Sequence, residues 1–127
     1  MKDDQLTNHA KLLDEWQKRL GLHDWRIKLE GCCSPDEMEL DAVGCTAWQE
    51  TTKTAKIQIL SEDYYEKRVV PFDWEKTLVH ELLHLKTCLL SDVEDSLQER
   101  VAHMLIDDLA RAFVDAKRSG VKPYDVK

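Results

Sequence analysis

The segment 79–85 constrains this chain more than any other, because it spaces two histidines four residues apart and puts a glutamate after the first. Its apolar residues favour a helix, so His80 and His84 would lie one turn apart on one face, with Glu81 about 100° around the axis. Neutral imidazoles bind Zn²⁺ at roughly 2.0–2.1 Å, and a helix supplies two of them with little ordering. This HExxH motif therefore predicts a Zn²⁺ site with Glu81 beside it as general base.

The residues around the motif predict a buried helix. Residues 71–74 have the character of a loop that ends in Asp73 as helix N-cap. From Thr77 onward, apolar residues stand on nearly every side of the expected helix, which predicts burial on nearly every side. Two histidines and a glutamate in such a helix need polar partners, and a metal ion would supply one.

A Zn²⁺ site with two helical histidines needs a third protein donor, and helix geometry narrows the choice. Residues 91–94 have the form of a capping box, so a second helix is expected to start there. Counting outward from that break along an antiparallel helical hairpin brings Glu99 nearly level with His84. By the same count, His103 arrives level with His80.

Glu99 also shares a largely apolar stripe with residues expected to face the protein interior, namely Ala102, His103, Ile106, Ala110 and Phe113. A carboxylate on such a stripe needs a cation nearby. We therefore predict Glu99 as the third ligand. His103 is the main alternative, and if Glu99 binds the metal, His103 is expected to support the site or to stabilise the transition state. An exposed Glu99 that pairs with Arg100 is the remaining interpretation.

The sequence HELLH at residues 80–84, followed by a helix with Glu99 and Ala102, resembles the gluzincin-type zinc metallopeptidases, in particular the minimal single-domain minigluzincins. It is also similar to the small HExxH proteases of bacteria and mobile elements that cleave phage-type repressors. The resemblance covers residues 20–115 and implies Glu81 as general base and acid, with Glu99 completing the zinc ligands. It also implies a zincin-like fold in which a strand at a sheet edge pairs with an extended peptide substrate. Gln98 stands where the larger gluzincins have asparagine.

The rest of the chain predicts an α+β fold in one domain, residues 1–127. Helical spacing over 4–20 ends at Gly21, and residues 25–30 alternate as a strand. Residues 43–49 and 55–60 predict a hairpin through the polar turn 50–53. The expected order is an N-terminal helix, a sheet of about three strands, the motif helix and a C-terminal helix that carries the third ligand.

Charge and cysteine content limit the partners and the compartment. The net charge is −7, and no dense Lys/Arg cluster is present, which argues against nucleic acid as a partner. No apolar run approaches the ~20 residues of a membrane span. The four cysteines form no CxxC pair, and a reducing compartment is the simplest interpretation. We expect a cytoplasmic monomer that acts on a peptide or protein substrate.

Three functions are compatible with the motif. The leading one is a zinc metallopeptidase, in which His103, Tyr64, Tyr65 or His23 could donate to the oxyanion. The second is a zinc-binding regulatory or protein-binding module with little or no turnover. The third is a zinc hydrolase of the rRNA-maturation type, which has glycine after the first histidine and a third histidine soon after the second; Glu81 and residues 85–90 do not match it.

Overall fold

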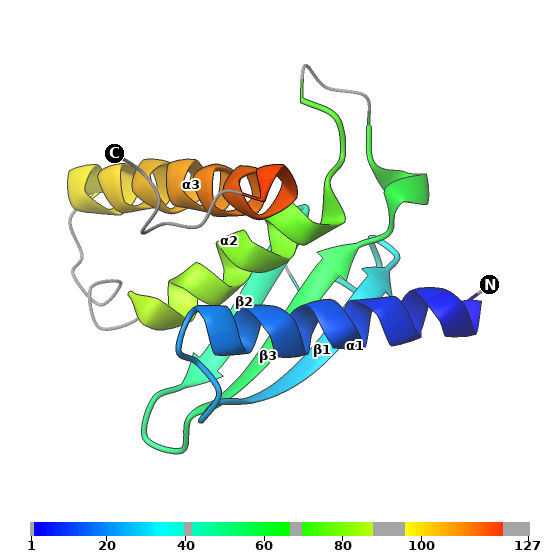
Figure 1. The fold of residues 1–127 in the computed structure, drawn as a ribbon, viewed down its shortest axis with the longest axis horizontal. Helices are drawn as coiled ribbons and strands as arrows, with labels where there is room; N and C mark the ends of the chain where they lie inside the picture. The colour runs from blue at the N-terminus through cyan, green and yellow to red at the C-terminus, as the bar shows by residue number, and fades with distance from the viewer. Residues whose placement is uncertain (1, 40–41, 67–69, 88–95, 121–127) are drawn as a thin grey trace.

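The computed structural model describes every residue except 1, 40–41, 67–69, 88–95 and 121–127. Its elements follow in the order α1 (Lys2–Arg19), β1 (Arg26–Cys33), β2 (Gly44–Gln49), β3 (Thr54–Leu60), the short 3-10 helix η1 (Glu62–Tyr64), α2 (Trp74–Lys86) and α3 (Ser96–Ser119) (Figure 1). The predicted α+β class is thus confirmed. Within those residues, no helix combines the length and the apolar character that crossing a membrane requires.

The three strands form one mixed sheet in the order β1-β3-β2. The predicted hairpin is confirmed: β2 pairs with β3 antiparallel, and Trp48 lies opposite Ala55. β1 pairs with β3 in parallel and continues to Cys33, three residues beyond the strand that the alternation over 25–30 predicts. β3 is therefore the central strand, and β2 is an edge strand.

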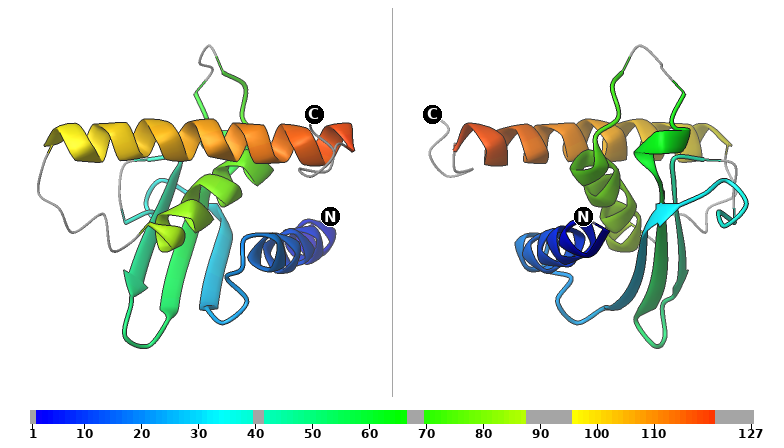
Figure 2. Two further views of the ribbon diagram at one scale, coloured as in Figure 1. Left: turned by 60° about the vertical axis from the view of Figure 1, so that its left-hand side comes forward. Right: turned by 90° about the vertical axis from the view of Figure 1, so that its right-hand side faces the viewer.

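The helices cover one face of the sheet in two layers. α1 and α2 pack on the strands, and α3 lies across α2 on its far side (Figure 2). The core between these layers consists of apolar side chains from all of these elements, with Trp16, Ile57, Ile59, Leu78, Val79, Leu82, Ile106, Ala110 and Val114 among the buried ones. The expectation that α2 is buried on nearly every side is confirmed, since seven of its residues are buried.

A buried glutamine on the opposite face of the sheet holds the chain between β1 and β2 in place. The Gln58 amide nitrogen donates to Glu30 Oε1 at 2.9 Å and to the Glu37 carbonyl at 2.8 Å. Its amide oxygen accepts from the Glu39 backbone N–H at 2.9 Å and from the Cys45 thiol at 3.2 Å. These four bonds satisfy a buried polar group and fix the segment that leads into β2.

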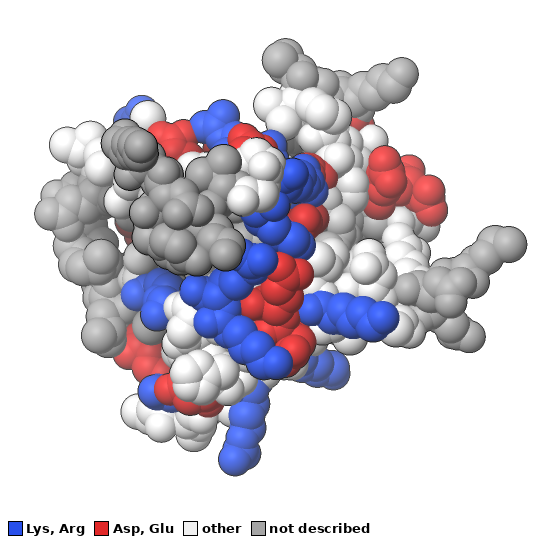
Figure 3. Space-filling view, viewed as in Figure 1, with Lys and Arg blue, Asp and Glu red and all other residues white. Residues whose placement is uncertain are grey.

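A charged cluster joins the three helices at the N-terminal end of α2. Asp73 is the N-cap of α2, as predicted, and accepts from the Lys76 backbone N–H. Asp73 also pairs with Arg118 at 2.7 Å, so the start of α2 is attached to the end of α3. Basic and acidic side chains lie interleaved over α1 and α3 on the face shown in Figure 3.

Candidate metal centre

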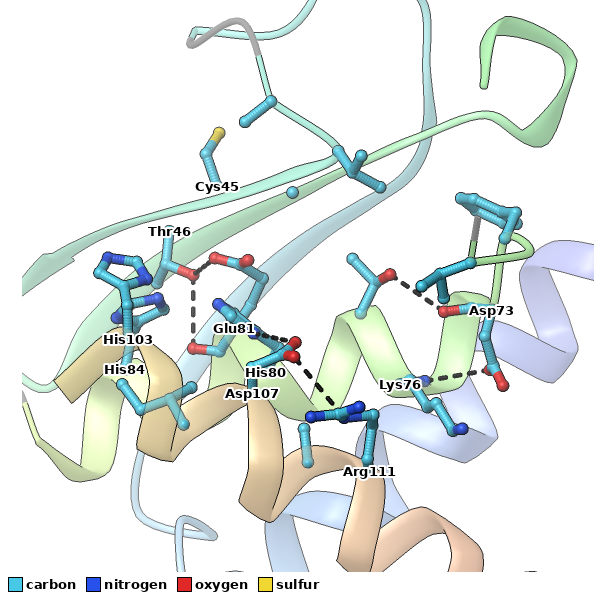
Figure 4. A pocket seen from close by; sticks show the side chains of 18 of the residues that line it. Cys45, Thr46, Asp73, Lys76, His80, Glu81, His84, His103, Asp107 and Arg111 are labelled. Atoms are coloured by element: carbon cyan, nitrogen blue, oxygen red, sulfur yellow. Dashed lines mark hydrogen bonds and ion pairs between the residues drawn. The ribbon is translucent and has the colours of Figure 1, made fainter. Parts of the chain in front are cut away.

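Three histidines from two helices converge beside the sheet. α2 presents His80 and His84, and α3 presents His103 (Figure 4). The ring centroids of His84 and His103 are 4.9 Å apart, those of His80 and His84 5.1 Å, and those of His80 and His103 6.0 Å. One nitrogen from each ring lies within 4.8 Å of the others, so this group could hold a metal ion.

The surroundings of the α2 histidines favour the neutral imidazole, which is the form that binds metals. Burial, together with the neighbouring His80 and His103, lowers the pKa of His84 to about 4. Burial also lowers the pKa of His80, against the opposing effect of Asp107. Both rings are therefore neutral at neutral pH, and each has one nitrogen without a proton that can bind a metal.

Asp107 gives His80 a fixed orientation. Its carboxylate lies 3.5 Å from His80 Nδ1 and 3.6 Å from the guanidinium of Arg111 (Figure 4). A carboxylate on one ring nitrogen of a histidine directs the other nitrogen toward a metal and increases its basicity. His80 is thus prepared to donate through Nε2.

Glu81 lies beside the histidines in a nearly closed environment. Only 6% of its surface is exposed. The Thr46 hydroxyl from β2 donates to Glu81 Oε1 at 2.7 Å (Figure 4). Burial raises the pKa of Glu81 to about 7, against the opposing effect of the Thr46 hydrogen bond. A carboxyl group with this pKa can both accept and release a proton near neutral pH.

Gly44 leaves the room that the Glu81 carboxylate occupies. A Cβ atom at Gly44 would lie 2.9 Å from Glu81 Oε2 and 2.9 Å from the methyl group of Thr77. Both distances are far inside van der Waals contact. A larger residue at the start of β2 would therefore have to displace the side chains of Glu81 and Thr77, and glycine lets Glu81 keep this position.

The site opens into a cleft of about 1080 Å³ that is bounded by β2, α2, α3 and the segment before α2. His80, Glu81, His84, Glu99 and His103 all line it. Figure 4 shows His84 and His103 at one end of the view, and Asp73 and Lys76 at the other. β2, which is an edge strand of the sheet that the structure describes, forms one wall beside the candidate metal centre.

No protein-family model, curated protein sequence or solved structure matches this chain. The donor set itself suits Zn²⁺: three imidazole nitrogens, a carboxylate that orients one of them, and a second carboxylate nearby. The residues present thus fit the metal that the motif predicts.

Glu99 is the predicted third ligand. It is exposed and lines the cleft, but it does not belong to the described group of converging donors. The structure places His103 beside His84. The residue count from the sequence predicts His103 level with His80, which lies one helical turn earlier in α2. The buried stripe of α3 is correspondingly formed by Ile106, Ala110 and Val114. The capping box predicted at 91–94 lies outside the described residues.

The other donors considered from the sequence are placed as follows. Tyr65 lines the cleft, but its hydroxyl donates to the Val70 carbonyl at 2.7 Å. Tyr64 and His23 are exposed and are not among the residues that line the cleft. His9, the remaining histidine, is buried and stacks on Trp74, with ring centroids 3.6 Å apart.

Sequence reasoning missed three residues of the site, Gly44, Thr46 and Asp107. Gly44 and Thr46 lie in β2, which the alternation predicts as a strand without indicating which helix residue each side chain faces. Asp107 could have been found, since it follows His103 by one helical turn and would share its face.

Proposed function

We propose that this chain is a zinc-dependent peptidase with a zincin-like arrangement. One arrangement of side chains carries the proposal. The imidazoles of His80, His84 and His103 converge, and the buried carboxyl group of Glu81, whose pKa is raised to about 7, lies beside them in a cleft that is lined by an edge strand. His80 and His84 would hold the zinc. His103 is favoured as third ligand, and Glu99 is the alternative.

The geometry of the donors favours His103 over Glu99. A tetrahedral site needs ligand atoms that can reach one ion at about 2 Å, so the donors must already lie close together. The nitrogens of His80, His84 and His103 meet this requirement within 4.8 Å. If Glu99 were the ligand instead, His103 would be available as a donor to the oxyanion.

The protein residues would divide the work of peptide hydrolysis. When bound, zinc supplies a Lewis acid that polarises the scissile carbonyl and acidifies the attacking water. Glu81 takes the proton from that water on a carboxylate oxygen and passes it to the leaving amine nitrogen. Thr46 fixes the rotamer of Glu81 through the 2.7 Å hydrogen bond, and Asp107 orients His80.

The edge strand suggests how a substrate would bind. β2 lies at the edge of the sheet and lines the cleft beside Glu81. An extended peptide can add to such an edge through backbone hydrogen bonds. We infer that an unfolded segment or a chain end lies along β2 with the scissile bond over the histidines.

Metal content is the first test. The purified protein should contain about one zinc per chain by mass spectrometry after reconstitution. The double variant His80→Ala/His84→Ala should lose it, and His103→Ala should weaken its affinity more than Glu99→Ala does. Circular dichroism of each variant controls for misfolding. Absence of zinc from the reconstituted wild type would rule the proposal out.

Turnover is the second test, because zinc alone does not make an enzyme. Glu81→Gln removes the general base without touching a ligand, so it should keep its zinc and lose at least about 10²-fold in cleavage of a mixed peptide library. Cleavage products identified by mass spectrometry give the readout. If zinc binds but neither protein cleaves any peptide, the alternative of a zinc-dependent binding module is correct.

A further inference from the structure

Glu99 lies in the cleft wall but outside the group of metal donors, and this calls for a role of its own. The contacts between α2 and α3 fix its position along the cleft. Lys76 pairs with Asp115 and His80 with Asp107, so the two helices run antiparallel. His103 lies against His84, and Glu99, one turn earlier in α3, lies beyond His84 toward the C-terminal end of α2.

Trp48 lines the same cleft from the opposite wall. β2 starts with Gly44, beside Thr77 and Glu81, and Thr46 lies next to Glu81. Trp48 is two residues further, on the same face of the strand, and thus also lies toward the C-terminal end of α2. Its indole is partly buried against the core and also lines the cleft. An aromatic wall and a carboxylate therefore border one end of the cleft.

The other carboxylates that line the cleft already have partners. Asp73 is paired with Arg118, Asp107 contacts His80 and Arg111, and Glu81 accepts from Thr46. At the opposite end, the ammonium group of Lys76 is neutralised by Asp115 at 3.3 Å. Among the described residues, no cation lies within ion-pair distance of Glu99. Its negative charge is thus available to a ligand in the cleft.

We propose that Glu99 and Trp48 form a subsite for a lysine or arginine side chain of the substrate. The inference rests on the proposed peptidase function and adds the specificity. The aliphatic stem of the basic residue would lie along the indole, and its cationic head would meet the Glu99 carboxylate. A peptide that adds antiparallel to β2 runs from Trp48 toward Gly44, so the basic residue lies on the N-terminal side of the scissile bond.

The first experiment separates this role from that of a zinc ligand. Glu99→Gln keeps the shape of the side chain and removes its charge. We expect it to retain one zinc per chain with unchanged affinity, as should the control Glu62→Gln, which removes the same charge from an exposed position in η1. Loss of zinc from Glu99→Gln alone would make Glu99 the third ligand, leaving the peptidase proposal intact and ending this inference.

The second experiment measures the specificity directly. Three peptide libraries with blocked ends are compared, and they differ at one fixed position, which is lysine, glutamine or glutamate. Mass spectrometry identifies the cleavage sites. In the wild type, lysine on the N-terminal side should exceed glutamate by about tenfold in kcat/KM, from an exposed ion pair with Glu99 together with packing of the aliphatic stem on the indole. The preference should fall to about twofold in Glu99→Gln, reverse in Glu99→Lys, and persist in Glu62→Gln.

Salt gives a readout that a purely structural role of Glu99 would not change. The lysine preference should shrink in the wild type between low salt and 1 M NaCl, because exposed charges are screened, and should stay constant in Glu99→Gln. Cleavage without charge bias, or with a bias on the C-terminal side, would overturn the subsite and leave the peptidase proposal standing. Failure to cleave any library would reject the peptidase proposal and the subsite with it.

Discussion

At the scale of single residues, the space beside Glu81 is set by Gly44. The Glu81 carboxylate fits between β2 and α2 because position 44 has no side chain, and the Thr46 hydroxyl then holds Oε1 at 2.7 Å. A methyl group at position 44 would have to push either the carboxylate or α2 away. Since a general base acts only within hydrogen-bond reach of the water, a small displacement has a large effect.

Gly44→Ala should therefore lower kcat by about 100-fold. Zinc content should stay at the wild-type value, because the atoms nearest to a Cβ at position 44 belong to Glu81 and Thr77, which are not among the proposed zinc ligands. The control is Ala47→Val, which adds bulk to the exposed side of the same strand and should keep nearly full activity. An unimpaired Gly44→Ala enzyme would mean that the carboxylate can act from another position.

The sequence predicted the residues of the HExxH motif, but it did not predict the residues that fix the positions of those side chains. His80, Glu81 and His84 follow from local spacing, since one helix carries all three. Thr46 lies 35 residues from Glu81, and its contact depends on how the sheet meets α2. An alternating strand pattern tells which residues share a face, and it does not tell what that face touches.

At the scale of elements, the pairing of α2 with α3 decides which donor reaches the metal centre. The count from the sequence assumed a short turn between the two helices. The contacts of His84 with His103 and of His80 with Asp107 instead pair the two helices about one turn further along α3. Periodicity predicted both helices, but the register depends on the connection, which carries no periodic signal.

The cluster around Glu75 fastens the other end of the same helix pair. Glu75 is 8% exposed and accepts from the Trp16 indole N–H at 2.7 Å, and it also pairs with Lys117 and Arg118. Burial raises the pKa of Glu75, but the bonds from Lys117 and Trp16 and the nearby positive charges outweigh it, so the pKa lies below 4.5. One carboxylate thus connects α1, α2 and α3.

Glu75→Gln should lower the free energy of unfolding at pH 7 by about 1 to 3 kcal/mol, because the basic groups lose their buried partner. A carboxyl whose pKa is lowered by folding stabilises the protein above its unfolded pKa, and this contribution is lost as pH falls through the folded pKa. Urea unfolding should therefore show a steeper loss of stability below about pH 4.5 in the wild type than in Glu75→Gln.

The matched control is Glu15→Gln. Glu15 pairs with the same Lys117 at 3.0 Å but is more exposed, so its loss should cost less than about 1 kcal/mol. Equal effects of the two substitutions would show that burial of Glu75 contributes nothing to its stabilising role.

At the scale of the whole molecule, α3 is attached to the rest of the protein at two separate places. The Asp73–Arg118 and Glu75 contacts hold its C-terminal end. In its N-terminal half, Ile106 is buried, Asp107 contacts His80, and His103 can share a metal with His80 and His84. A bound metal would therefore be a further cross-link between these two consecutive helices.

Zinc should accordingly raise the melting temperature. At a free concentration 100 times its dissociation constant, a ligand specific for the folded state adds about 2.7 kcal/mol, which corresponds to roughly 10 °C for a chain of this size. Differential scanning calorimetry with and without a chelator measures the shift, and His80→Ala/His84→Ala should show none. A wild-type melting temperature that does not respond to zinc would contradict a cross-linking role.

The arrangement of the sheet was open to prediction only in part. Local alternation and a polar turn predicted the β2–β3 hairpin, because its strands are neighbours in sequence. The parallel pairing of β1 with β3, which leaves β2 at the edge, joins strands that are separated in the sequence by all of β2. Such pairing depends on the packing of the complete core, and no local pattern encodes it.

The edge position of β2 has a consequence for the behaviour of the protein at high concentration. Many proteins prevent edge strands from pairing with other molecules by placing lysine or proline in them. β2, with the sequence GCTAWQ, contains neither, nor any other charged residue. The same strand edge that suits a peptide would also accept the β2 strand of a second copy, so crowding should favour reversible self-association that a peptide ligand suppresses.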